Sequence, residues 1–329
     1  MAIPKNTKVV VIGGGTGSFV VLSGLKNYFN DLTALVTMAD DGGSTGQLRD
    51  ELGVLPPGDV RQCLVALARS PKVRDLFNFR FEEGSLKGHS FGNLFLTALE
   101  KMTGDFRAGV ELATEVLEVV GRVEPITLDK VTLVIQDGNK IVRGQRKIDD
   151  GAFVANRPEL WLEPPNSTAN PAAKEAIKQA ALIVIAPGSL YTSLGAALVV
   201  PEIGAALKKS PAKKVYVCNL MNKSGQTDGF TVQDYANELE RMAGEQFLDY
   251  VIYNTTKPQP QLLKKYAVEG ELPVDLGKKT KTHYALIGAD LLADKIWQGK
   301  SSADALAQTR TLIRHHPDHL AKQIVNILS

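Results

Sequence analysis

The chain has 329 residues and a mass of 35.6 kDa, which is enough for one large α/β domain or two smaller ones. Hydrophobic residues make up 44% and charged residues 22%, as in an ordinary globular protein. The formal net charge of +2 is too small to indicate a nucleic-acid-binding protein, so we expect no nucleic-acid partner.

The sequence carries no pattern typical of a membrane span or of export. No apolar run is long enough to cross a bilayer, and residues 1–8 are polar where a secretory signal needs an apolar stretch. Cys63 and Cys218 lie in apolar runs without metal or disulfide spacing, which predicts two buried free thiols in a reducing compartment. We therefore expect a cytoplasmic protein with no membrane partner.

The first informative stretch is a glycine turn between a strand and a helix. Residues 9–12 are apolar and predict a buried strand, and residues 19–28 predict a helix. The glycines between them suit a turn that points backbone N–H groups and a helix N-terminus at a phosphate. The alternative is that they only allow the helix to approach the strand closely. Ser18 and Val20 stand where the usual dinucleotide pattern requires glycine.

The second stretch follows a strand predicted over residues 32–38, which ends in the neighbouring acids Asp40 and Asp41. In a doubly wound sheet the first two strands end side by side, so we expect both acids to face the glycine turn. Asp40 lies where a dinucleotide fold places its ribose-binding acid, and the pair could instead hold Mg²⁺. The alternative is helix capping, because Ser44 and Gln47 have the spacing of a capping box.

Two further positions have a functional and a structural interpretation of similar weight. Asp59, followed by Gln62, either caps the helix predicted over residues 60–68 or contacts a ligand. His89 lies in a polar loop over residues 84–93, where it could be a ligand donor, an acid or base, or a hydrogen-bonded loop residue.

From residue 122 the pattern becomes rich in short strands. Strand-like runs and an Asp-Gly hairpin signal predict a β-rich insertion at about residues 122–163 in a single α/β domain that covers residues 1–329.

The α/β pattern then resumes with a second turn of small residues. A buried strand over residues 181–186 leads into Gly188 and Ser189, which form a second candidate phosphate site unless Ser189 is merely a helix cap. No nucleophile-elbow motif surrounds Ser189 or Ser193, so we do not predict a hydrolase serine. Asn219 and Asn254 end two later strands, where open α/β sheets bind their ligands.

Several motifs in register resemble one family. They are VIGGGTG (residues 11–17), ADDGGSTG (39–46), PGD (57–59), GHSFGN (88–93) and PGSLYTS (187–193), with CN at 218–219 and TDG at 227–229. The chain resembles the YvcK family of gluconeogenesis factors, which is related to CofD, the transferase that makes 2-phospho-lactate-containing deazaflavin cofactors. The resemblance extends over nearly the whole chain.

The resemblance implies a Rossmann-like three-layer α/β/α fold with a mainly parallel sheet, and a cytoplasmic location. It also implies binding of UDP-sugars, notably UDP-N-acetylglucosamine, and a role in cell shape and wall-precursor supply during gluconeogenic growth. In this family a tyrosine and an arginine are linked to UDP-sugar binding, and Tyr266 and Arg314 look like their counterparts. The sequence departs from the family at residues 222–226, where Thr-Gln-Pro-Gly-Glu is commoner, at Tyr235, where histidine is common, and at Gln145, where glutamate is usual.

We therefore predict a UDP-sugar-binding regulatory protein that acts through a cell-wall precursor enzyme and forms a homo-oligomer. The glycine turn and the turn over residues 187–193 would hold the diphosphate, and Asp40 and the strand-end asparagines would contact ribose or base. The residues predicted to contact the ligand are Gly13, Gly14, Gly15, Thr16, Gly17, Asp40, Asp41, Gly42, Ser44, Asn93, Gly188, Ser189, Tyr191, Thr192, Ser193, Asn219, Asn254, Tyr266 and Arg314.

Two other functions stay open. The first is a CofD-type transferase of a nucleotide-linked phosphoryl group, with Asp40, Asp59 and His89 as catalytic candidates and Asp40 and Asp59 as Mg²⁺ ligands. The second is an NAD-dependent oxidoreductase, which the missing glycines disfavour, although NAD could still bind weakly.

Overall fold

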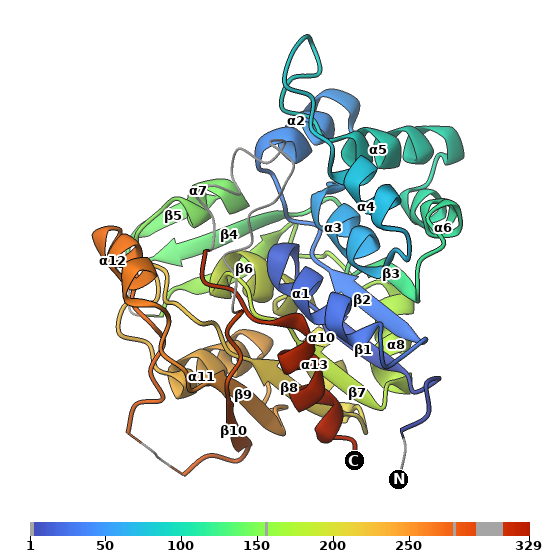
Figure 1. Cartoon of the computed structure of the whole chain (residues 1–329). Helices are drawn as coiled ribbons and strands as arrows, with labels where there is room; N and C mark the ends of the chain where they lie inside the picture. The colour runs from blue at the N-terminus through green and yellow to red at the C-terminus, as the bar shows by residue number, and fades with distance from the viewer. Residues whose placement is uncertain (1–2, 155–156, 279–280, 294–311) are drawn as a thin grey trace.

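The computed structural model describes residues 3–154, 157–278, 281–293 and 312–329. The main feature of its fold is a parallel β-sheet. In these residues seven strands follow the order β10-β9-β8-β7-β1-β2-β3, and each neighbouring pair is parallel (Figure 1). The strands are β1 (Val9–Ile12), β2 (Leu32–Val36), β3 (Arg122–Pro125), β7 (Leu182–Ile185), β8 (Lys213–Val217), β9 (Tyr250–Asn254) and β10 (Ala285–Ala289). The predicted α/β class with a mainly parallel sheet is confirmed.

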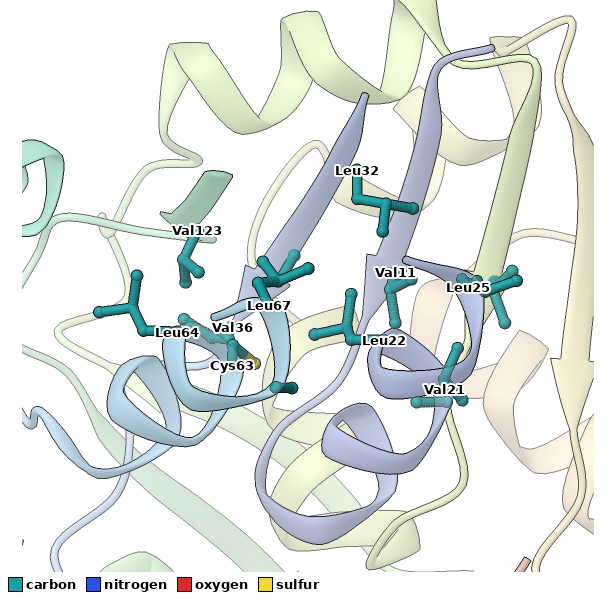
Figure 2. Packing of buried hydrophobic residues seen from close by; sticks show 14 of the residues in the cluster. Val11, Val21, Leu22, Leu25, Leu32, Val36, Cys63, Leu64, Leu67 and Val123 are labelled. Atoms are coloured by element: carbon teal, nitrogen blue, oxygen red, sulfur yellow. The ribbon is translucent and has the colours of Figure 1, made fainter. Parts of the chain in front are cut away.

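Helices cover both faces of this sheet, which gives three layers. Side chains alternate along β1, so Val9 and Val11 belong to one core and Val10 and Ile12 to the other. Figure 2 shows the first core, where side chains of two helices pack on β1 and β2. Because both faces are covered, the central strands are apolar throughout.

The helices on the first face are α1 (Gly15–Leu25), α3 (Gly58–Leu67), α4 (Pro71–Asn78), α5 (Phe91–Thr103), α6 (Phe106–Val116) and α13 (Pro317–Asn326). Those on the second face are α7 (Gln145–Asp149), α8 (Pro171–Gln179), the π-helix η1 (Leu190–Gly195), α9 (Ala196–Leu198), α10 (Ile203–Lys209) and α11 (Val232–Ala243). The remaining helices in the described residues are α2 (Gly43–Leu52) and α12 (Pro260–Val268). Cys63 and Cys218 are free and buried, as predicted.

A second, smaller sheet is formed by the part of the chain between β3 and β7. It is antiparallel, with the order β5-β4-β6, formed by β4 (Thr132–Asp137), β5 (Lys140–Arg143) and β6 (Glu159–Glu163). The expected β-rich insertion is present, but its predicted start at about residue 122 is too early. β3 pairs with β2 as the edge of the main sheet, because Val123 buries its side chain in the first core and Arg122 Nε donates to Thr33 Oγ1 at 3.0 Å.

The order of the strands reverses between β1 and β7. The chain moves from β1 outward to β2 and β3, then returns to place β7 on the other side of β1. Loops at the carboxyl ends of these two strands therefore lead away in opposite directions and leave room between them, where open α/β sheets bind ligands. Both glycine turns of the sequence lie at this point.

Among the described residues, no single helix is both long enough and apolar enough to cross a membrane. One pair, Leu190–Leu198 and Ile203–Lys209, meets the length and composition criteria together, but it is bent by 73°. Most residues of η1 and α9 in this pair are buried in the second core.

Gly17→Ala tests how tightly α1 approaches the loop after β7. A Cβ at Gly17 would lie 1.6 Å from the carbonyl oxygen of Pro187, which is backbone and cannot step aside. Alanine normally stabilises a helix interior relative to glycine, whereas here we expect a loss of roughly 2 kcal/mol or more in the free energy of unfolding. Urea denaturation measures it.

The control for this variant is Thr16→Ala on the same turn of α1, since Thr16 is exposed and should change stability by no more than about 0.5 kcal/mol. Equal or greater stability of Gly17→Ala would contradict the close approach.

Candidate functional site

The glycine turn joins β1 to α1 in the predicted way. Gly13 and Gly15 have φ values of +151° and +60°, and Gly14 is the N-cap of α1 without any side-chain cap. No acidic residue lies in the first turn of α1. The helix N-terminus is therefore free of a local carboxylate and can receive an anion from elsewhere.

That anion is the carboxylate of Asp59, which comes from α3. Asp59 is not the N-cap of α3, since Pro57 holds that position, so the capping interpretation of Asp59 is wrong. Its carboxylate instead accepts a hydrogen bond from the backbone N–H of Gly15. A Cβ on Gly14 would lie 2.0 Å from Asp59 Oδ2, so glycine is required for this approach.

Asp40 lies beside Asp59. A Cβ on Gly58, the residue before Asp59, would lie 2.8 Å from Asp40 Oδ2. Burial and, to a smaller extent, the negative charge of Asp40 raise the pKa of Asp59 to about 7, against the opposing effects of the Gly15 N–H and Arg61. Burial also raises the pKa of Asp40, although the Gly42 N–H and the Thr45 hydroxyl oppose this. The pair therefore tends to keep a proton or to attract a cation near neutral pH.

Asp41 faces the other way. Its Oδ1 accepts from the backbone N–H of Arg146 at 2.7 Å, and a Cβ on Gly144 would lie 2.6 Å from its Oδ2. The carboxylate thus satisfies the N-terminus of α7. Our expectation that both acids face the glycine turn is wrong for Asp41, because consecutive residues after a strand point in opposite directions and α7 offers unsatisfied N–H groups.

Ser44 and His89 meet next to this pair. The N-cap of α2 is Gly42, and Ser44 makes no cap bond, so the predicted capping box is wrong. Ser44 Oγ instead lies 2.9 Å from His89 Nδ1 and accepts from Asn93 Nδ2 at 3.4 Å. Asn93 Oδ1 in turn accepts from Arg61 Nε at 3.0 Å. These contacts attach the polar loop of His89 to the start of α2.

The second turn lies directly against the first. The hydroxyl oxygen of Ser193 would lie 3.2 Å from a Cβ on Gly14 and 3.4 Å from one on Gly188. The side-chain amide of Asn219 bonds both polar backbone groups of Gly188. Its Oδ1 accepts from Gly188 N at 3.1 Å, and its Nδ2 donates to Gly188 O at 2.7 Å. Asn219 therefore positions the turn.

The other hydroxyl-bearing residues of the second turn point toward the insertion. Ser189 is the N-cap residue of η1, as the capping interpretation expected, but its side chain makes no cap bond. Ser189 Oγ and Thr192 Oγ1 both donate to Asp149 Oδ1, at 3.2 and 2.7 Å. Tyr191 has no exposed surface and packs edge-to-face on Phe153 at 5.1 Å, so its side chain belongs to the core and not to a ligand surface as predicted.

Asp149 and Lys223 are site residues that the sequence interpretation missed. Lys223 Nζ lies 2.6 Å from Asp149 Oδ1, the oxygen that also receives the two hydroxyls. Burial alone would raise the pKa of Asp149, but Lys223 and the two hydroxyls together hold it below its usual value. The only sequence signal was the departure of residues 222–226 from the family pattern.

Asn254, Tyr266 and Arg314 lie on the β9–β10 side. The Asn254 amide bonds to backbone groups of Thr256 and Leu291, which joins the loops after β9 and β10. Tyr266 accepts from the Ile313 N–H at 3.2 Å, so the structure brings it to the segment that carries Arg314. Burial raises the pKa of Tyr266, and Arg314 lies near enough to oppose this.

Mg²⁺ fits the Asp40–Asp59 pair in part. Carboxylate oxygens are its preferred protein ligands, and it commonly takes one or two carboxylates and completes its shell with substrate phosphates. Within the described ranges, no cluster of three or more His, Cys, Asp or Glu residues could hold a metal ion. Asp40 and Asp59 would thus supply two oxygens and leave the rest to the ligand and water.

Asp59→Asn tests the buried carboxylate through the pH dependence of stability. A carboxyl whose pKa is 3.8 unfolded and about 7 folded stabilises most below about pH 4, and this contribution is lost as the pH rises to 7. We expect the wild type to lose roughly 2 kcal/mol more than Asp59→Asn between pH 5 and pH 8 in urea denaturation.

Asp50→Asn, which removes an exposed carboxylate, should follow the wild-type profile. Parallel profiles for the wild type and Asp59→Asn would show that Asp59 titrates as an ordinary carboxyl.

The chain is similar to known proteins over most of its length. A family model described as 2-phospho-L-lactate transferase CofD matches residues 9–292. The gluconeogenesis factor of Bacillus subtilis is 39% identical over 328 residues, which cover 98% of this chain and 99% of that protein. The gluconeogenesis factor of Halalkalibacterium halodurans is 43% identical over 274 residues, which cover 82% and 84%.

A solved structure shows the same likeness. A member of the UPF0052 family from Bacillus halodurans superposes with a TM-score of 0.86 at 36% identity, and the match covers 98% of this chain and 100% of that one. The chain therefore belongs to the CofD family and, within it, to the YvcK family of gluconeogenesis factors.

Proposed function

We propose that the protein binds a nucleotide sugar, UDP-N-acetylglucosamine, at the carboxyl ends of β1, β2 and β7, and that the bound form supports cell-wall precursor supply during gluconeogenic growth. The names of the relatives support the gluconeogenic part. The resemblance supports the ligand. A partner enzyme of wall-precursor synthesis and a homo-oligomeric state belong to the same proposal.

One observation supports this site above others: the first turn, which contains Gly14, and the second turn, which contains Gly188, lie against each other at Ser193. A diphosphate carries two phosphate groups that need two neighbouring sets of backbone donors, and glycine lets the backbone approach them. Asp59 lies at the first turn with its raised pKa, so in its protonated form it can donate to a phosphate oxygen instead of repelling it.

The structure suggests a different role for Asn219 from the one we first assigned. The side-chain amide of Asn219 is engaged with Gly188, so we propose that it positions the second turn and does not itself contact the nucleotide. Asp40 keeps its proposed contact with ribose or with Mg²⁺. Tyr266 and Arg314 keep the role in UDP-sugar binding that the resemblance implies.

Asn219→Ala should weaken binding of UDP-N-acetylglucosamine about tenfold, because the Gly188 peptide loses both bonds that orient it. Isothermal titration at pH 6.5 measures this, with UDP and NAD as competing ligands. Asn27→Ala, at an exposed position after α1, is the control and should bind as the wild type does. Absence of wild-type binding at high micromolar ligand would sink the proposal.

The second candidate function is a CofD-type transfer from a nucleotide, which the Asp40–Asp59 pair and the Ser44–His89 contact favour. Mg²⁺ bound by Asp40 and Asp59 would neutralise charge on the leaving phosphate. His89 would exchange a proton at Nδ1 with Ser44 or with an acceptor hydroxyl in its place.

Asp40→Asn should abolish any Mg²⁺-dependent release of nucleotide when the group it carries is transferred to an added acceptor alcohol, since the variant removes one of two carboxylates. Nucleotide release with and without Mg²⁺, followed by chromatography, measures the reaction, and Asp50→Asn should retain it. No turnover by the wild type with any nucleotide sugar would leave binding as the function.

A further inference from the structure

A single carboxylate oxygen at the second turn receives three donors. Asp149 Oδ1 is bonded by Ser189 Oγ, by Thr192 Oγ1 and by Lys223 Nζ. The hydroxyl oxygens of Ser189 and Thr192 also lie 2.6 Å apart. The ammonium of Lys223 is therefore separated from the candidate phosphate turn by one oxygen atom only.

The backbones on both sides of this ion pair are held firmly. Lys223 N donates to Thr227 Oγ1 at 2.8 Å, and Thr227 Oγ1 bonds the buried hydroxyl of Tyr235. On the other side, Gln226 Nε2 donates to the carbonyl oxygens at the end of α7, those of Ile148, Asp149 and Gly151. The part that can change position is consequently the Lys223 side chain.

The side chains of the pair are accessible. The side chain of Lys223 is 31% exposed and that of Asp149 is 36% exposed. Ion pairs with this much exposure contribute about 1 kcal/mol or less to the stability of a protein. Ammonium groups are common ligands of phosphate, and a diphosphate offers more negative charge than one carboxylate. A diphosphate at the second turn would compete successfully for Lys223.

We propose that Lys223 is a displaceable cation of the nucleotide-sugar site, held by Asp149 without ligand and transferred to a phosphate oxygen when a diphosphate occupies the second turn. The class of ligand rests on the proposed function. Asp149 then keeps the hydroxyls of Ser189 and Thr192 and lowers the affinity for the ligand, because it both competes for Lys223 and repels phosphate.

The two partners should change affinity in opposite directions. Lys223→Gln should weaken binding of inorganic pyrophosphate and of UDP-N-acetylglucosamine about tenfold, whereas Asp149→Asn should tighten both about threefold or more. Lys223→Arg should preserve most of the affinity. In the Lys223→Gln background, the gain from Asp149→Asn should shrink, because no ammonium remains to be released. Isothermal titration of each variant measures these changes.

Lys147→Gln is the matched control, since Lys147 is an exposed lysine on α7 that makes no part of the pair. Thermal unfolding of every variant checks that each is folded. If Lys223→Gln and Asp149→Asn both weaken binding, the ion pair is a fixed structural contact and the proposal is overturned.

The two probes separate this inference from the proposed function. If pyrophosphate shows the opposite changes and the nucleotide sugar does not bind, Lys223 acts as stated and the ligand assignment fails. If the nucleotide sugar binds with the same affinity in all variants, the ligand stands and the role of Lys223 fails. If neither probe binds the wild type, both proposals fail.

Discussion

The carboxylate of Asp59 at the N-terminus of α1 is the interaction on which the site depends. It explains why Gly14 carries no side chain, since a Cβ there would meet Asp59 Oδ2. It brings Asp59 next to Asp40, where burial raises the pKa of both groups and the negative charge of Asp40 contributes to the rise at Asp59. From the sequence alone, the N-terminus of α1 is a simple anion site. In the structure it already holds the carboxyl group of Asp59, whose charge must be balanced by a proton, a cation or a ligand.

The small helix α7 connects the two halves of the site. Its N-terminus receives the carboxylate of Asp41 from the end of β2, and its last residue, Asp149, receives the hydroxyls of the turn after β7. The insertion is therefore attached to the carboxyl edge of the main sheet on both sides of β1. A movement of the loop after β2 or of the turn after β7 would be transmitted to α7, because each is bonded to one of its ends.

Much of the fold could be predicted because its signals are local. Apolar β-branched runs identify buried strands, and those expected over residues 9–12 and 181–186 are β1 and β7. The acid and asparagine positions at strand ends follow from the geometry of parallel sheets. The side chains of Ser44, Asp59 and Ser189 make no cap bond, because each has a partner on another element that outweighs the local pattern.

The sequence by itself determined the α/β class, the two glycine turns and the polar residues at the carboxyl edge, since each depends on neighbours along the chain. Only the tertiary structure decided which acid faces the glycine turn, that Tyr191 lies in the core, and that Lys223 meets Asp149. The reason is physical: these outcomes depend on contacts between segments tens of residues apart, and a single carboxylate bonds to whichever unsatisfied donor the fold places within reach.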